Sequence, residues 1–543
     1  MAQEAGSPLV PDLGSGTQVA GGGFYTRKAT GLVRGISARD SFVMNVAFIN
    51  IALGALGFTL APFAFPGVDL FWSAIVCTGL VIFPTAMYAM LSASMPRSGG
   101  DYVFVSRILH PAIGFAANFN TTIWMTFFTG ILASWVSGFA ASSALLTIGT
   151  VTKSTTLVDW SATAATKGWQ FGIGLVTIAV FTALVAMGTR TTFRVLGVMF
   201  SVMIGCQVVA LAVLAFHSHA DFVGSFGKYG NYDKLLSDAR AQGFQWPGGT
   251  HFSQTLGAMP LFFSSIGYGI VSCYCSGEVK QASRTSMTSM VGAVIFGGGV
   301  IALFGALSMH VFGSDFLQAI QGLSGTDQYP LAAPPFFYLF VSMLTSNTFI
   351  LALIGIGFVL AIVANIPPMF MIATRNILAW AFDRMIPSSL ADVNPRFASP
   401  VKATVLTGVA MAAFMTFFIY SPNKWTGWVF TAGIGSLITF LIVAICGIVF
   451  PWRRPDIYES SPYRRSIGGV PLITLVSIPS AAFYLLLIYY LLTNDALGAN
   501  SRNGKIALVV VFCLPLVIYA VASAINRKRG FDLSAAHAEL PPE

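Results

Sequence analysis

Twelve apolar runs long enough to cross a membrane dominate this chain of 543 residues. A helix needs roughly 20 apolar residues to span a hydrocarbon core of about 30 Å, and a transmembrane β-barrel would show shorter alternating strands instead. Only 9% of the residues are charged, whereas soluble domains carry about a quarter. The pattern predicts an all-α polytopic membrane protein with about twelve transmembrane helices. The runs cover 41–62, 70–94, 112–146, 168–188, 191–216, 256–276, 287–311, 347–373, 401–420, 425–450, 469–492 and 505–525.

The distribution of positive charge predicts how these helices are oriented. If the N-terminus is cytoplasmic, 21 of the Lys and Arg residues lie on the inner side and 8 on the outer side. Cytoplasmic loops carry such an excess, so we expect a multi-pass protein of the cell (inner or plasma) membrane with both termini in the cytoplasm. The net charge of +9 is then explained by topology and lipid contact, and no nucleic-acid partner is expected. The Gly/Ser-rich N-terminus lacks the pattern of a cleaved signal peptide.

Long connections divide the predicted helices into blocks. The boundaries are a cytoplasmic tail at 1–40, a first five-helix repeat at 41–216, an extracellular loop at 217–255, a second five-helix repeat at 256–450, two further helices within 469–525, and a cytoplasmic tail at 526–543. Many transporters are inverted repeats in which a glycine-interrupted helix at matching positions of the two halves marks the binding site. Here the first helix of each block carries such glycines, so we expect residues 54–57 and 263–267 to be non-helical and to line one central cavity.

The glycine-containing segments define the predicted substrate site. Glycine also lets membrane helices pack closely, and the seventh and tenth helices carry glycines as well, so packing remains an alternative reading. In the binding reading, backbone groups at two helix breaks hold both charges of a zwitterion, which would otherwise be costly to bury. The predicted substrate-binding residues are Gly54, Ala55, Leu56 and Gly57 in the first helix and Phe263, Ser264, Ser265, Ile266, Gly267 and Tyr268 in the sixth.

Three further segments resemble a known family. Met95–Phe104 is similar to the Pro-x-[Ser/Ala]-Gly-Gly-x-Tyr loop of the amino acid–polyamine–organocation superfamily, 262–285 resembles its sixth helix and cytoplasmic exit, and 374–400 resembles its loop after the eighth helix. The resemblance covers roughly 35–450. It implies an amino acid permease with a five-plus-five inverted repeat, helices 1 and 6 broken in mid-membrane, and alternating access. The first helix departs from the family's Gly-[Ser/Thr]-Gly-Ile-Phe motif.

The predicted membrane interior contains no Asp or Glu. An intramembrane acid would mark a proton relay or a cation site, so a neutral amino acid is favoured over a polyamine or organic cation. A lysine that some family members carry in helix 5 is Met203 here, which disfavours a lysine-based proton step. A coupling ion, proton or sodium, remains open, as do exchange and facilitated diffusion. The ion-site candidates are Asn50, Ala361 and Asn365, and the eighth helix should be interrupted at Asn365-Ile366-Pro367-Pro368.

The remaining polar residues suggest a gate but no catalytic chemistry. Glu278 and Lys280 are candidates for a cytoplasmic gate with a loop arginine, although a solvated helix end is an alternative. The six cysteines show neither disulfide nor metal spacing, so no metal, cofactor or catalytic residue is expected. A channel would need a filter or charged rings, and an enzyme would need intramembrane catalytic groups. Another small metabolite as substrate, or a nutrient sensor that does not transport, remains open.

Overall fold

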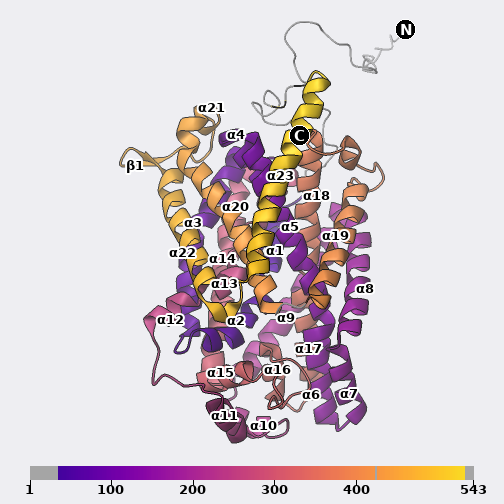
Figure 1. Cartoon of the computed structure of the whole chain (residues 1–543), viewed down its shortest axis with the longest axis vertical. Helices are drawn as coiled ribbons and strands as arrows, with labels where there is room; N and C mark the ends of the chain where they lie inside the picture. The colour runs from indigo at the N-terminus through magenta and orange to yellow at the C-terminus, as the bar shows by residue number, and fades with distance from the viewer. Residues whose placement is uncertain (1–34, 422–424, 532, 534–543) are drawn as a thin grey trace, which may run out of the picture.

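The computed structural model describes residues 35–421, 425–531 and 533, and it is a helical bundle (Figure 1). Within these residues, eleven helical spans are long and apolar enough to cross a membrane. Three of them are interrupted: α1 (Ala38–Ile49) continues as α2 (Ile51–Ala64), α5 (Pro111–Trp135) passes through the π-helix η1 (Val136–Ala141) into α6 (Ser142–Thr152), and α17 (Thr348–Val363) continues as α18 (Ile366–Phe382). The other eight are α3 (Leu70–Ser94), α8 (Lys167–Ala186), α9 (Thr189–Ala215), α14 (Ala282–Val311), α19 (Val401–Tyr420), α20 (Trp425–Arg453), α22 (Leu472–Thr493) and α23 (Arg502–Lys528).

The sixth predicted span, 256–276, is not among these eleven because its helix is broken into short pieces. The chain forms two short helices, α12 (Phe252–Gly257) and α13 (Met259–Ile266), and then turns at 267–270. Two 3₁₀ helices follow, η2 (Val271–Tyr274) and η3 (Ser276–Glu278). The all-α prediction is therefore confirmed. Eleven of the twelve predicted spans form long helices, three of them interrupted, and the remaining predicted span forms only short helices.

The break in the first span lies at Asn50, which differs from the prediction. Asn50 has φ 53° in the left-handed region, a conformation that asparagine tolerates better than most residues. Residues 54–57 lie inside α2, and 263–266 end α13 with Gly267 as the C-cap. The expectation that 54–57 and 263–267 are non-helical is thus wrong, apart from the chain turning at Gly267.

The prediction of an interrupted eighth helix is confirmed. α17 ends at Val363, and α18 begins at Ile366 with prolines at its first positions. Pro367 and Pro368 lack backbone N–H donors, and proline fits best in the first turn of a helix, where those donors have no partner within the helix. Ala364 and Asn365 therefore form a turn between the two halves of this span.

The two ends of the bundle carry different short elements. The end that is lower in Figure 1 is covered by helices from the connections predicted as loops. These are α7 (Thr155–Ala164), α10 (His219–Phe226), α11 (Tyr232–Ala241), α15 (Ser314–Gly322) and α16 (Phe337–Met343). The upper end carries α4 (Asp101–Ile108), α21 (Pro455–Glu459) and an antiparallel pair, β1 (Ser466–Ile467) with β2 (Val470–Pro471). The 3₁₀ helix η4 (Ser388–Ala391) follows α18, and η5 (Asp495–Leu497) joins α22 to α23.

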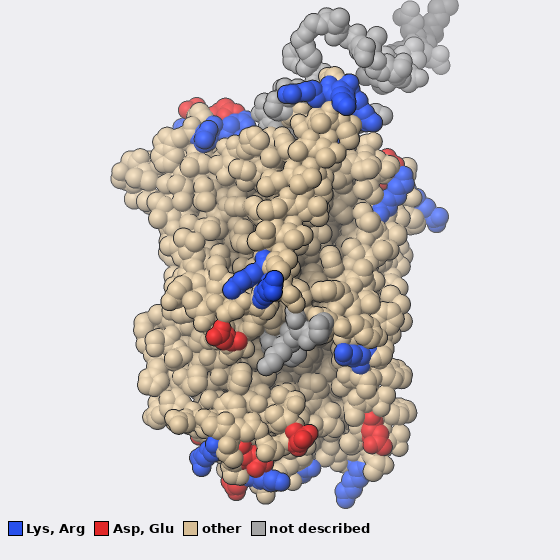
Figure 2. Space-filling model, viewed as in Figure 1, with Lys and Arg blue, Asp and Glu red and all other residues tan. Residues whose placement is uncertain are grey.

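Burial separates the centre of the bundle from its periphery. The most apolar window of α1–α2 is 94% buried, whereas that of α23 is 17% buried. Figure 2 shows Lys and Arg at the upper end, both Lys/Arg and Asp/Glu at the lower end, and a few charged residues in the middle of this face, with uncharged surface over much of the area between. An uncharged flank between charged ends is the surface that a bilayer requires. The interrupted helix α1–α2 therefore lies inside the bundle.

Candidate functional site

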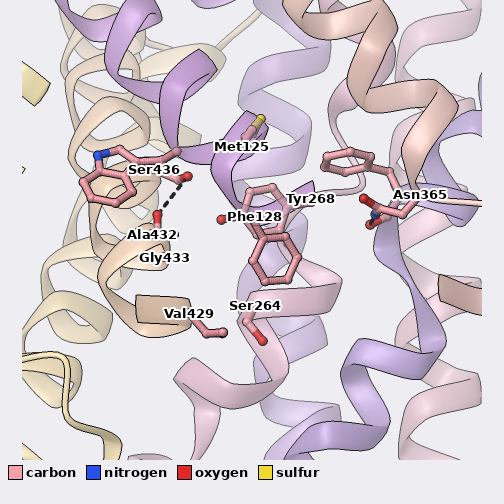
Figure 3. Close-up of a pocket in the computed structure, with 11 residues that line it drawn as sticks. Met125, Phe128, Ser264, Tyr268, Asn365, Val429, Ala432, Gly433 and Ser436 are labelled. Atoms are coloured by element: carbon pink, nitrogen blue, oxygen red, sulfur yellow. Dashed lines mark hydrogen bonds between the residues drawn. The ribbon is translucent and has the colours of Figure 1, made fainter. Parts of the chain in front are cut away.

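A small cavity lies where the three interrupted spans meet. Its volume is about 30 Å³, which holds about one or two water molecules and is too small for an amino acid. The walls come from α1, α5, α13 and the turn after it, the α17–α18 junction, and α20 (Figure 3). The lining residues are Phe48, Trp124, Met125, Phe128, Ser264, Tyr268, Asn365, Val429, Ala432, Gly433 and Ser436.

Three of the predicted site residues line this cavity. Ser264, Tyr268 and Asn365 approach it from different sides in Figure 3. The Ser436 hydroxyl donates to the Ala432 carbonyl at 3.2 Å and interacts with Tyr268. Polar groups therefore reach this largely apolar pocket from α13 and the turn after it, from the α17–α18 junction and from α20.

The predicted residues of the first helix do not line the cavity. Gly54 packs so closely that an added Cβ would lie 2.7 Å from the Ile301 side chain, and at Gly57 a Cβ would lie 3.4 Å from the ring of Phe262. Ala55 and Leu56 are buried in α2. These contacts match the alternative reading, in which glycine permits close helix packing.

The other residues of the sixth segment support the pocket from behind. Phe263 packs edge-on against Phe483 and Tyr484, and a Cβ on Gly267 would collide with the Phe263 ring. Ile266 is fully buried. The ring of Phe263 in α13 occupies the space that a side chain at Gly267 would need, so this packing requires glycine at position 267.

Side chains from other segments partner the carbonyls released at the Asn50 break. Ser265 donates its hydroxyl to the Ile49 carbonyl and, at 3.1 Å, to that of Asn50. The Asn365 amide donates from Nδ2 to the Phe48 carbonyl at 3.0 Å. The last carbonyls of a helix have no partner within the helix. The sixth and eighth spans therefore hold the break of the first.

Asn365 leaves one strong acceptor unused at the cavity. The side chain is only 3% exposed, and among the described residues its Oδ1 has no hydrogen-bond donor. A buried carbonyl oxygen without a donor carries a desolvation penalty of about 1–3 kcal/mol. Oδ1 is consequently ready to accept a hydrogen bond from a bound solute or from an ion.

An aromatic wall shapes the opposite side of the cavity. Trp124 donates its indole N–H to Asn120 at 3.0 Å, and Asn120 in turn donates to the Gly435 carbonyl at 2.6 Å. A Cβ at Gly435 would lie 2.2 Å from the Trp124 ring, whereas one at Gly433 would meet no atom within 4 Å. The glycine at 435 therefore leaves the space that the indole of Trp124 occupies against α20.

A buried ion pair links the segment that follows α13 to α18. Arg375 in α18 binds the Glu278 carboxylate with two hydrogen bonds, 2.7 Å from Nε to Oε1 and 2.9 Å from Nη2 to Oε2. Thr189, at the start of α9, donates to Oε2 at 3.1 Å and accepts from Nη2 at 2.9 Å. Both charged side chains are 2% exposed. This pair connects η3, α9 and α18.

Lys280 lies beside this pair but takes no part in it. Its backbone N–H donates to the Ile36 carbonyl at 2.9 Å, and Ile36 donates to the Glu278 carbonyl at 3.0 Å. Lys280 also lines a larger cavity of about 790 Å³, together with Arg190, Arg194 and Arg396. The sequence-based hypothesis named a loop arginine as the partner of Glu278, whereas the arginine in contact lies within a helix.

A second buried ion pair lies at the same end. Arg107 in α4 contacts Asp383 at 3.0 Å, and the Tyr102 hydroxyl donates to the same carboxylate oxygen at 2.7 Å. The side chains of the ion pair are 0% and 2% exposed. Two separate buried arginine–carboxylate contacts thus join elements at this end of the bundle.

The predicted ion-site residues lie at or near the breaks. Asn50 forms the first break, Asn365 the eighth-span turn, and Ala361 is fully buried in α17. In the part of the chain that the structure describes, no group of three or more His, Cys, Asp or Glu residues could hold a metal ion. A coupling-ion site therefore stays a prediction.

Sequence comparison agrees with the site in pointing to transport. A family model described as amino acid permease matches residues 41–522. Two relatives from Bacillus subtilis are a methylthioribose transporter, 22% identical over 86% of this chain and 90% of that protein, and a branched-chain amino acid permease, 23% identical over 84% and 88%. A vacuolar cationic amino acid transporter of Arabidopsis thaliana is 35% identical, over only 19% of this chain and 16% of that protein. The chain belongs to the amino acid permease family, a family of transporters and not of enzymes.

Proposed function

We propose that the protein is a secondary transporter that carries a neutral amino acid across the plasma membrane by alternating access. One observation carries the proposal: the cavity at the helix breaks is lined by aromatic, small and uncharged polar side chains, with Asn365 Oδ1 unpartnered among the described residues. A charged substrate side chain in such a pocket would need a counter-charge. A neutral side chain needs only the apolar walls.

In this proposal the two main-chain breaks bind the substrate's charged ends. The amide groups that begin α2 after Asn50 form a helix N-terminus, which favours the carboxylate. The substrate ammonium would donate to Asn365 Oδ1 and to carbonyls at the end of α1. The aromatic walls at Trp124, Phe128 and Tyr268 would contact the side chain.

Alternating access follows from the volume of the cavity and from what closes it. Because about 30 Å³ cannot hold an amino acid, binding requires a conformation in which the walls separate. The buried pair Glu278–Arg375 closes the upper end, which we assign to the cytoplasm from the excess of Lys and Arg. Both chain termini then lie in the cytoplasm.

Residues 41–216 and 256–450 would form two inverted five-helix repeats, followed by the helices within 469–525.

Counterflow in proteoliposomes tests the proposal. Vesicles loaded with unlabelled L-leucine should accumulate radiolabelled L-leucine, and external neutral amino acids should compete while lysine, arginine and spermidine should not. Strong competition by spermidine would overturn the neutral assignment. Methylthioribose belongs among the competitors because one relative is named as its transporter, and its competition to the exclusion of amino acids would identify a different substrate class. Leucine binding without counterflow would indicate a sensor.

A further inference from the structure

Asp101 is a buried carboxylic acid without a positively charged partner. It begins α4 and is 0% exposed. Its Oδ2 accepts a hydrogen bond from the Tyr274 hydroxyl in η2, and its Oδ1 has no hydrogen-bond partner among the described residues. A carboxylate in this position would carry a buried charge without a cationic partner, which is unfavourable.

The surroundings of Asp101 contain weak acids from four other elements and no cation. The groups that interact with it electrostatically are Tyr88 in α3, Cys273 and Tyr274 in η2, Cys446 in α20 and Tyr484 in α22. Over residues 35–421, 425–531 and 533, no Lys, Arg or His nitrogen lies within 4.0 Å of its carboxylate. None of the neighbouring groups can neutralise an ionised Asp101.

The other buried acids at this end differ in that respect. Among the described residues, Asp383 and Glu278 are the only further buried acids. Asp383 contacts Arg107, and Glu278 contacts Arg375. Each of these two buried acids therefore contacts an arginine, whereas Asp101 does not.

Burial also places the titration of Asp101 in the physiological range. Desolvation raises its pKa to about 6, partly opposed by hydrogen bonding to Tyr274 and Tyr88. For an acid with a raised pKa, the stability that the group gives to this packing is present at low pH and is lost as the pH rises through about 6. The closed packing around Asp101 is consequently favoured when the carboxyl group is protonated.

Asp101 is tied to the segment that leaves the broken sixth span. Gly99, two residues before it, donates its N–H to the Tyr274 carbonyl at 3.0 Å. Gly100 has φ 47°, and a Cβ there would lie 2.6 Å from the Tyr274 ring. The loop before α4 therefore packs directly on η2, and water can reach Asp101 only if these elements separate.

We infer that Asp101 is a proton-binding site through which proton movement is coupled to opening and closing of this end of the transporter. The inference rests on the proposed function and adds a dependence of the closed upper end on pH. Water at the upper end supplies one proton to the carboxylate as the loop and η2 pack together, and the same proton returns to that water when they separate and the carboxylate is solvated. No other group needs to change its charge.

Asp101→Asn tests the coupling because the amide is uncharged at every pH and has nearly the same shape. In proteoliposomes we expect a proton gradient with its acidic side at the upper end to slow L-leucine counterflow about tenfold in the wild type, because protonated Asp101 favours the closed packing, and not at all in D101N. Leucine counterflow without a gradient should persist in D101N. The control is Asp392→Asn, an exposed acid at the same end of the protein, which should respond to the gradient as the wild type does. A gradient response that survives in D101N overturns the inference.

A measurement without substrate separates this inference from the proposed function. Infrared spectra of the purified protein, recorded between about pH 5 and pH 8, should show the carbonyl band of a protonated carboxyl group that titrates near pH 6. The band should be absent in D101N and present in D392N. No titrating band, or the same band in D101N, overturns the inference even if leucine is transported. If the band titrates as expected but no amino acid is transported, the proposed function fails while the proton site stands.

Discussion

Removing the charge of Glu278 should open the upper end of the protein. In Glu278→Gln the side chain keeps its shape, but the guanidinium of Arg375 loses its counter-charge while 2% exposed. Breaking a buried ion pair from one side costs about 3–5 kcal/mol. We expect the lower value, because the amide oxygen still accepts one hydrogen bond and Thr189 remains beside the guanidinium. At about 1.4 kcal/mol per tenfold change, the closed conformation loses about 100-fold against any conformation that hydrates Arg375.

A native cysteine reports this opening. Cys275 is 0% exposed and lies three residues before Glu278, so a maleimide reaches it only when η3 separates from its neighbours. In a Cys513→Ser background, which removes the exposed cysteine, E278Q should raise the labelling rate of Cys275 by up to about 100-fold. Cys275→Ser identifies the labelled site.

The matched control breaks an exposed pair at the same end. Asp392 contacts Lys402 at 2.7 Å, but these side chains are 62% and 59% exposed. Exposed ion pairs contribute about 0–1 kcal/mol, so Asp392→Asn should change the labelling rate by less than about fivefold. If E278Q labels Cys275 no faster than D392N does, the buried pair does not hold this end closed and the reasoning is wrong.

Two further predictions concern the cavity. Gly435→Ala should lower the free energy of unfolding by about 1–3 kcal/mol, because its Cβ would overlap Trp124. Gly433→Ala should leave the melting temperature unchanged and favour smaller substrates, because its Cβ meets no atom within 4 Å. Equal melting temperatures of the two variants would contradict this. Asn365→Ala should raise the Kd for L-leucine at least about tenfold, by removing the unpartnered Oδ1 and the bond to the Phe48 carbonyl; isothermal titration calorimetry showing an unchanged Kd would exclude Asn365 from the site.

Local chemistry made part of this fold predictable from the sequence. Hydropathy predicted every span, because lipid leaves a helix few alternatives, and the Pro367-Pro368 pair located the interruption of the eighth span. Glycine was a weaker signal. Gly54 permits close packing against Ile301, while the break itself lies at Asn50, whose side chain tolerates a left-handed backbone.

The walls of the cavity were not predictable in the same way. Trp124 and Phe128 in α5, and Gly433 and Ser436 in α20, meet the broken spans only through packing between distant parts of the chain. A single sequence records no such neighbours, and each of these residues reads equally well as ordinary helix packing. The arginine partner of Glu278 was missed for the same reason, since Arg375 lies 97 residues away.

The segment from Gly267 to Lys280 connects the cavity to the closed end. Ser272 is fixed by Asn45 of α1 through two hydrogen bonds of 2.9 and 3.1 Å. Beyond it, Tyr274 meets Asp101, and Glu278 meets Arg375. If Tyr268 moves to make room for substrate, the segment that follows it moves as well. That movement would displace Tyr274 from Asp101 and Glu278 from Arg375. If this segment moves as a unit, protonation of Asp101 and formation of the Glu278–Arg375 pair favour the same closed conformation, so D101N should slow the labelling of Cys275 that E278Q accelerates.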